Sequence, residues 1–127
     1  LDRPEPLVPI GAGFDAVLHL APPPESGPGD PRTAHLVAAL SAQGMLPERF
    51  VYISTSGVYG DCAGARIDET RAPNPGTARA QRRVDAERLL LDWGAAQGVN
   101  VAVLRVPGIY AADRLPLERL KKGTPVL

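Results

Sequence analysis

The sequence predicts an α/β fold in which a parallel β-sheet is built from strands that alternate with helices. Three hydrophobic runs, at 14–20, 49–54 and 100–106, are expected to form strands. The connections between them are long enough to cross the face of a sheet. We therefore expect three parallel strands, adjacent in chain order and joined by right-handed crossovers.

The first strand is expected from Phe14 to about Ala21, as a short buried strand. Three consecutive prolines follow it, so the strand cannot continue and a rigid loop leads to Asp30. Asp30 can cap a helix whose first position is Pro31, because the first N–H of a helix has no partner and proline lacks one. This helix should end near Gly44.

The second strand, Arg49–Ser54, leads into a long loop at 55–76. A loop of that length in a compact domain is usually functional. A second helix is expected over about 77–97, and it leads into the third strand, Asn100–Val106. A short final helix is expected at Asp113–Lys122, because lysines and a glycine close that segment.

Length and composition limit the possible functions. The 127 residues form one domain at most, and the 14 basic residues balance the 14 acidic ones, so no nucleic-acid or membrane partner is expected. No apolar run approaches the roughly 20 residues that span a bilayer. The single cysteine, Cys62, excludes an internal disulfide and predicts a cytoplasmic location. No metal site is predicted.

The segment from Arg49 to Gly60 is the most informative stretch of the chain. A hydrophobic strand ends there in hydroxyl side chains and glycines, and ligands of open α/β sheets bind at the carboxyl ends of strands. The segment resembles the strand that carries the active-site Ser/Thr in the extended short-chain dehydrogenase/reductase family, which includes nicotinamide-dependent epimerases and dehydratases. Matching on Val58-Tyr59-Gly60 places Thr55 on the catalytic hydroxyl.

The resemblance spans nearly the whole chain, from Phe14 to about Leu127. It implies a Rossmann-type three-layer sandwich with a partial parallel sheet, equivalent to strands four to six with their connecting helices. Residues 1–127 would then be the C-terminal half of an NAD(P)-binding domain in a longer protein. The resemblance is specific in four places: His19-Leu20-Ala21, Ser54 to Gly60, Asp68-Glu69-Thr70 with the prolines after it, and Leu104 to Tyr110.

The glycine-rich turn that cradles phosphates in such domains is missing. No Gly-x-Gly-x-x-Gly sequence follows a strand, and Gly11-Ala12-Gly13 precedes one. The resemblance explains this, because in the family that motif lies on the first strand, which has no counterpart in this chain.

One departure from the family pattern concerns its Tyr-x-x-x-Lys pair. The match at Ala86-Glu87 sets the register, so the tyrosine position holds Arg79 and the lysine position holds Arg83. Helical spacing predicts that both side chains point toward the sheet and converge with Thr55 beside Pro107-Gly108. Arginine stays charged and is a poor proton donor or acceptor, but it can stabilise an oxyanion or hold a phosphate or carboxylate.

The resemblance implies a cofactor, NAD or NADP, and assigns residues to its site. The implied catalytic residues are Thr55, which would bind the substrate oxygen, Arg79, which would stabilise negative charge, and Arg83, which would replace the lysine near the nicotinamide ribose. The implied cofactor-binding residues are Leu20, Ala21, Pro22, Ser54, Arg83, Pro107 and Gly108.

Each candidate also has a plain structural explanation. Hydroxyls at a strand end can satisfy loop backbone, and the arginines can form a solvated face or pair with Asp68, Glu69 or Glu87. We expect Asp68 to organise its loop. We expect packing roles for His19 and Tyr59, although Tyr59 is the phenol nearest to Thr55 in sequence, and a passive thiol at Cys62.

Three functions remain open. The first is an NAD(P)-dependent oxidoreductase or epimerase/dehydratase, acting on a nucleotide sugar or another small hydroxy or carbonyl compound, with a homodimer in the full-length protein. The second is a catalytically silent dinucleotide-binding module that senses redox state or serves a partner protein. The third is a structural α/β fragment without a ligand.

Overall fold

The computed structural model describes residues 13–109, 111, 115, 117 and 121–123. Its sheet has the strand order β1-β2-β3, formed by β1 (Ala16–His19), β2 (Arg49–Thr55) and β3 (Asn100–Val106). Both strand pairs are parallel. The predicted arrangement of three parallel strands in chain order is therefore confirmed, with β2 at the centre.

The first crossover contains α1 (Pro31–Ala42). The carboxylate of Asp30 accepts the backbone N–H of Arg32 at 3.1 Å and that of Thr33 at 3.3 Å. A cap of this kind typically contributes ~1 kcal/mol. The chain leaves the helix through Gly44, whose φ of 64° lies in the left-handed region that favours glycine. Both predicted ends of this helix are confirmed.

The second crossover contains α2 (Ala78–Gln97), the longest described helix. Thr77 caps it, because its Oγ1 accepts the backbone N–H of Ala80 at 3.1 Å. Gly94 brings the helix close to β3: a Cβ added there would lie 2.5 Å from Cγ2 of Val101. Glycine at this position therefore permits the close approach that presses α2 onto the sheet.

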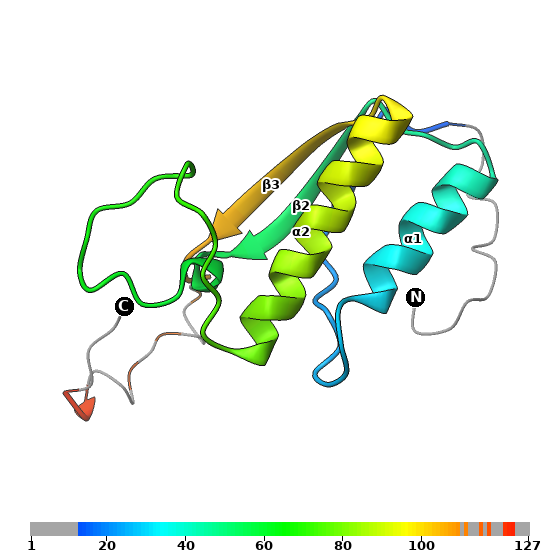
Figure 1. Ribbon diagram of the computed structural model, residues 1–127. Coiled ribbons are helices and arrows are strands. Elements are labelled where there is room, and N and C mark those ends of the chain that lie inside the picture. The colour runs from blue at the N-terminus through cyan, green and yellow to red at the C-terminus, as the bar shows by residue number, and fades with distance from the viewer. Residues whose placement is uncertain (1–12, 110, 112–114, 116, 118–120, 124–127) are drawn as a thin grey trace.

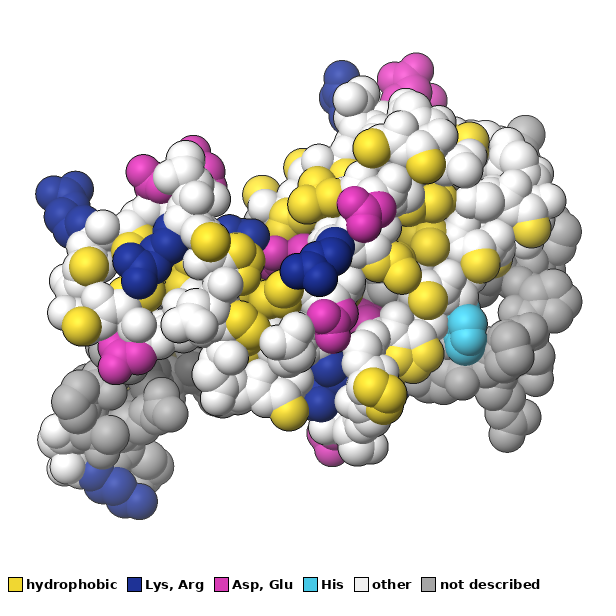
Figure 2. All heavy atoms as spheres, in the orientation of Figure 1, with side chains coloured by type: hydrophobic (Ala, Val, Ile, Leu, Met, Phe, Trp, Pro, Cys, Tyr) yellow, Lys and Arg dark blue, Asp and Glu magenta, His cyan; other side chains and the backbone are white. Residues whose placement is uncertain are grey.

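Both helices cover the same face of the sheet (Figure 1). Side chains of β2 alternate between the two faces, and Phe50 and Tyr52 are fully buried on the helical side. They form a core with residues of both helices and of the turn before β3: Val37, Leu40, Ala86, Leu90 and Val99. On this side of the molecule, basic and acidic side chains are interspersed (Figure 2).

The opposite face of the sheet is open among the described residues, with Leu18 61% and Leu104 48% exposed. The described part of the chain thus forms two of the three predicted layers. The expectation of a buried first strand at Phe14–Ala21 is corrected. β1 is shorter and only His19 is buried in it, because the described helices cover one face alone.

β2 continues directly into a short 3₁₀ helix, η1 (Ser56–Tyr59), which corrects the expectation that the irregular loop begins at Thr55. The rest of the loop returns to η1, where the N–H of Asn74 donates to the carbonyl of Val58 at 2.8 Å. The final helix predicted at Asp113–Lys122 falls largely outside the described residues. Within the described part of the chain, no helix is long and apolar enough to cross a bilayer.

Candidate functional site

Thr55 is the last residue of β2 and caps η1. Its Oγ1 accepts the backbone N–H of Gly57 at 3.2 Å, and the side chain is half-buried. A hydroxyl that accepts from the backbone keeps its own proton for donation. Thr55 can therefore donate a hydrogen bond to an oxygen of a ligand at this strand end.

Arg83 is buried beside the carboxyl end of β2, with 8% of its surface exposed. Its Nη1 donates to the hydroxyl of Tyr52 at 2.9 Å and to the carbonyl of Ile53 at 2.7 Å. The guanidinium carbon lies 5.4 Å from the centre of the Tyr52 ring. No described carboxylate forms an ion pair with it. Arg83 is thus a buried cation whose hydrogen-bond acceptors are neutral groups. It lies next to the strand end that carries Thr55.

Arg79 does not lie on the buried, sheet-facing side of α2 that includes Arg83. The predicted face is buried at Arg83, Ala86 and Leu90, but Arg79 is exposed. It precedes Ala80, the first buried residue of α2, and lines a separate hollow with the loop after β1. The expected convergence of three residues is therefore corrected: Thr55 and Arg83 share the end of β2, whereas no described contact joins Arg79 to them.

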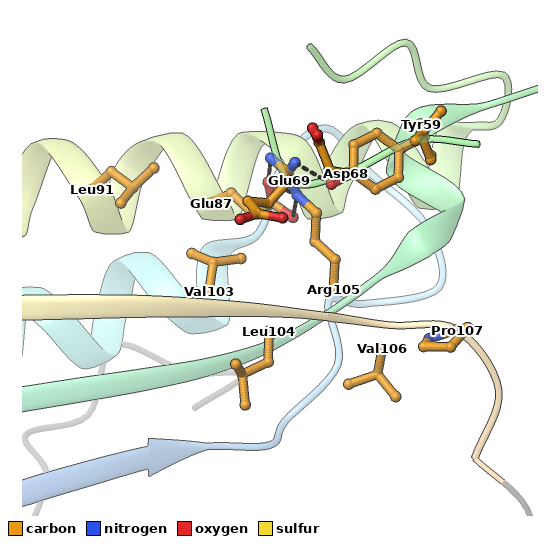
Figure 3. A pocket seen from close by; sticks show the side chains of 11 residues that line it. Tyr59, Asp68, Glu69, Glu87, Leu91, Val103, Leu104, Arg105, Val106 and Pro107 are labelled. Carbon is orange, nitrogen blue, oxygen red and sulfur yellow. Dashed lines mark hydrogen bonds and ion pairs between the residues drawn. The ribbon is translucent and has the colours of Figure 1, made fainter. Parts of the chain in front are cut away.

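An ion pair between the half-buried Arg105 and the buried Glu87 joins α2 to β3. Nη2 of Arg105 lies 2.8 Å from Oε2 of Glu87, and Nη1 donates to the hydroxyl of Tyr59 at 2.9 Å. The hydroxyl of Ser54 donates to Glu87 from β2. Figure 3 shows Arg105 extending from β3 toward Glu87 and Tyr59. The alternative in which Glu87 pairs with Arg79 or Arg83 is not realised, because Arg105 occupies this carboxylate.

This cluster forms one wall of an open hollow of about 700 Å³ on the outer side of β3 (Figure 3). Asp68 and Glu69 from the long loop and Leu91 from α2 complete the visible rim. The hydrogen bonds that Arg105 donates to the carboxylate of Glu87 raise the pKa of Arg105 above its ordinary value. The cluster fixes the ends of β2 and β3 relative to α2.

His19 belongs to a second buried network, at the end of β1. Its Nε2 lies 2.9 Å from Oγ1 of Thr33, which donates to Asp30 at 2.6 Å. The imidazole stacks on Tyr52 with 5.4 Å between ring centres. Burial lowers the pKa of His19, Asp30 raises it by less, and the charge of Arg83 lowers it further. The expected packing role of His19 is confirmed, and Tyr52 links this network to Arg83.

The other residues expected to contact a dinucleotide lie at the carboxyl ends of β1 and β3. Leu20 is 61% exposed, Ala21 is half-buried, and the carbonyl of Pro22 accepts a hydrogen bond from an arginine of α1 at 3.0 Å. Pro107 and Gly108 follow β3 and are exposed. Ser54 is instead buried against Glu87. The cofactor contacts of all these residues stay predictions.

The long loop is organised as expected at Asp68. Its Oδ1 accepts from the hydroxyl of Thr70 at 2.6 Å and from the N–H of Thr70 at 3.0 Å, and these two bonds lower the pKa of Asp68. Cys62 is a half-buried free thiol that packs against Val58, Tyr59 and Val84. Among the described residues, no group of His, Cys, Asp or Glu side chains could hold a metal ion.

Arg82 and Arg105 were not among the predicted site residues, although Arg82 belongs to the run of cations at the start of the predicted second helix. The sequence could have indicated a partner for Arg105, since a charged residue inside an apolar strand needs one when it is largely removed from water. Arg82 is buried because it donates to the carbonyls of Glu25 at 2.8 Å and Gly27 at 3.4 Å. Those acceptors lie 57 and 55 residues away in sequence, so local spacing could not reveal them.

Comparison with known families identifies the chain. Residues 32–122 match the NAD dependent epimerase/dehydratase family. The chain belongs to this family. The resemblance to extended short-chain dehydrogenases/reductases is therefore confirmed, and with it the Rossmann-type parallel sheet.

Relatives of this epimerase/dehydratase chain include a reductase and two structures with bound dinucleotides. GDP-6-deoxy-D-mannose reductase from Pseudomonas aeruginosa is 38% identical over 132 residues, which cover 86% of this chain and 43% of the reductase. The structure of RMD from Pseudomonas aeruginosa complexed with NADPH has a TM-score of 0.64 and 30% identity, over 87% of this chain and 46% of that chain.

UDP-glucuronic acid 4-epimerase from Bacillus cereus in complex with NAD has a TM-score of 0.66. At 23% identity, over 89% of this chain and 41% of the epimerase, it supports the fold alone. The chain spans less than half the length of each of these relatives.

Proposed function

We propose that this chain belongs to an NAD(P)-dependent oxidoreductase or epimerase/dehydratase that acts on a nucleotide sugar or another small hydroxy or carbonyl compound. The observation that carries the proposal is the pairing of a hydrogen-bond donor, Thr55, with a buried cation, Arg83, at the carboxyl end of β2. Open α/β sheets bind their ligands at that edge. The reductase and the NADPH complex among the relatives support it.

The described residues fit the nicotinamide side of a dinucleotide. Nη1 of Arg83 is engaged by Tyr52 and Ile53, so its other N–H groups would donate to ribose hydroxyls. Leu20 and Pro107 expose apolar surface at the ends of the two strands that flank β2. With Ala21, Pro22 and Gly108, they would hold NAD or NADP on this side. The phosphate-binding glycine turn is absent from the chain. We accordingly propose that residues 1–127 are the C-terminal half of an NAD(P)-binding domain.

The chemistry of the site is limited by its arginine. Arg83 stays protonated, so it can stabilise negative charge but cannot exchange a proton with the substrate. Thr55 would hold the substrate oxygen through its own proton. A nicotinamide dinucleotide supplies hydride transfer when it is bound. In this proposal, Thr55 orients the reacting oxygen and Arg83 stabilises the charge that develops nearby.

A silent dinucleotide-binding module is the second candidate. Both positions that handle protons in the family frame are arginines here, and one of them, Arg79, is exposed and without contact to Thr55. A module that senses redox state or serves a partner protein would tolerate this loss. We also propose that the full-length protein is cytoplasmic and forms a homodimer.

The test uses the complete gene product that contains this chain. Binding of NADH and NADPH is measured by calorimetry, and cofactor oxidation is followed with nucleotide-sugar substrates. If the protein is an enzyme, Thr55→Ala should lower kcat by ~10²-fold, as expected for loss of one donor to a developing oxyanion. Cofactor affinity should be unchanged, and Ser56→Ala is the control on the next residue. Binding without turnover would favour the module, and absence of binding would contradict both candidates.

A further inference from the structure

A second hollow opens between the loop after β1 and the first turn of α2. It has a volume of about 360 Å³ and shares no lining residue with the hollow of Figure 3. Proline has no N–H, so the side-chain donors in this lining are two guanidinium groups. The lining residues are Pro22, Pro23, Pro24, Glu25, Arg79 and Arg82.

The two arginines of this hollow have no carboxylate partner among the described residues. Arg82 is 8% exposed, its Nη1 and Nη2 meet only backbone carbonyls, and its Nε is buried without any partner. Arg79 is exposed beside it. Burial of an uncompensated cation such as Arg82 is costly, and a cation in the first turn, here Arg79, is also opposed by the positive end of the helix dipole. An anion in the hollow would relieve both effects.

We propose that this hollow binds a phosphoryl group carried by the substrate. A guanidinium group matches two phosphate oxygens at once, and the N-terminus of α2 adds favourable electrostatic potential. Arg79 binds the anion from the solvent side, and Arg82 contributes its buried charge. The proposal rests on the proposed function and deepens it: the substrate is anionic, and it is anchored by Arg79 and Arg82 while Thr55 and Arg83 face its reacting end.

The openness of the hollow favours a substrate group over the resident cofactor. Pro22, Glu25 and Arg79 are exposed, so a bound anion stays close to water. Glu25 also lines the hollow, and its negative charge opposes the anion. A moderate affinity of this kind suits a group that must leave in every turnover.

The experiment titrates pyrophosphate and inorganic phosphate into the complete gene product by calorimetry. Arg79→Gln should raise the Kd for pyrophosphate about tenfold, which corresponds to one lost charge-assisted contact. Glu25→Gln should lower that Kd several-fold. Arg88→Gln is the matched control, because Arg88 is an exposed arginine of the same helix that does not line the hollow. Arg82→Gln would also release the carbonyls of the loop, so Arg79→Gln is the informative variant.

A parallel titration with NADH and NADPH separates the two proposals. We expect Arg79→Gln to leave the affinity for both dinucleotides unchanged. We also expect pyrophosphate to bind when NADH is already bound. Equal pyrophosphate binding by Arg79→Gln and Arg88→Gln would overturn the inference, as would competition between pyrophosphate and NADH. If pyrophosphate binding depends on Arg79 but no dinucleotide binds, the anion site stands and the proposed function fails.

Discussion

Three arginines that are largely removed from water occupy two contrasting regions of this protein. In β3, Arg105 meets the carboxylate of Glu87 and the hydroxyl of Tyr59. In the first turns of α2, Arg82 and Arg83 meet only carbonyls and a phenol. The same side chain is therefore compensated in one region and uncompensated in the other. The first arrangement links α2 to the sheet, and the second leaves positive charge without a counter-ion among the described residues.

Removal of the compensated arginine should have the largest effect on stability. Arg105→Met leaves Glu87 buried without its cation, since Ser54 alone remains as a donor. Breaking a buried pair from one side costs about 3–5 kcal/mol. Urea unfolding of the variant, with Arg88→Met as the exposed control, measures this loss. A loss below ~1 kcal/mol would show that the pair is not the structural element described above.

Removal of an uncompensated arginine should cost much less. Arg83→Met gives up two hydrogen bonds to neutral groups, each of which contributes ~1 kcal/mol, but it also removes a buried charge without a counter-ion. We expect a net loss of about 1 kcal/mol or less in the same unfolding experiment, together with weaker NADH and NADPH binding. If Arg83→Met were as destabilising as Arg105→Met, the proposed difference between a paired and an unpaired arginine would be contradicted.

The titration of His19 reports the charge of Arg83 directly. The pKa of His19 lies below its ordinary value of 6.5 in the folded protein, chiefly through burial. The unfolded chain therefore binds the proton more readily, so the contribution of His19 to stability is complete above pH 6.5 and is lost as the pH falls through the lowered pKa. Arg83→Met should raise the pKa of His19 in an NMR titration, and Arg105→Met should leave it unchanged. Equal shifts in both variants would refute this assignment.

The smallest effect is expected at Arg79. Its side chain is exposed, so Arg79→Gln should change the free energy of unfolding by no more than about 0.5 kcal/mol. The direction should be stabilising, because a cation leaves the positive end of the α2 dipole. Chemical denaturation without phosphate checks this. A clear loss of stability would mean that Arg79 supports the fold, and it would weaken the case for a ligand role.

Local sequence was sufficient for the elements of the fold. The strand at Arg49–Ser54, the cap at Asp30 and the helix start at Thr77 all follow from interactions within a few residues. The order of motifs was also sufficient for the family, and it placed Thr55 at the end of the central strand. Local sequence did not predict how far β1 is buried. This strand is largely exposed because both described helices lie on one face of the sheet.

The sequence by itself thus determined the α/β class, the chain order of the parallel strands and the position of the candidate site at their carboxyl ends. The tertiary structure alone decided which charges are paired. Glu87 lies four residues after Arg83 on the same helix, yet its carboxylate binds Arg105 from a different strand. Arg79 shares a nominal helix face with Arg83 but lies before the part of α2 that packs on the sheet. Electrostatic partners are chosen by distance in space, which local periodicity does not encode.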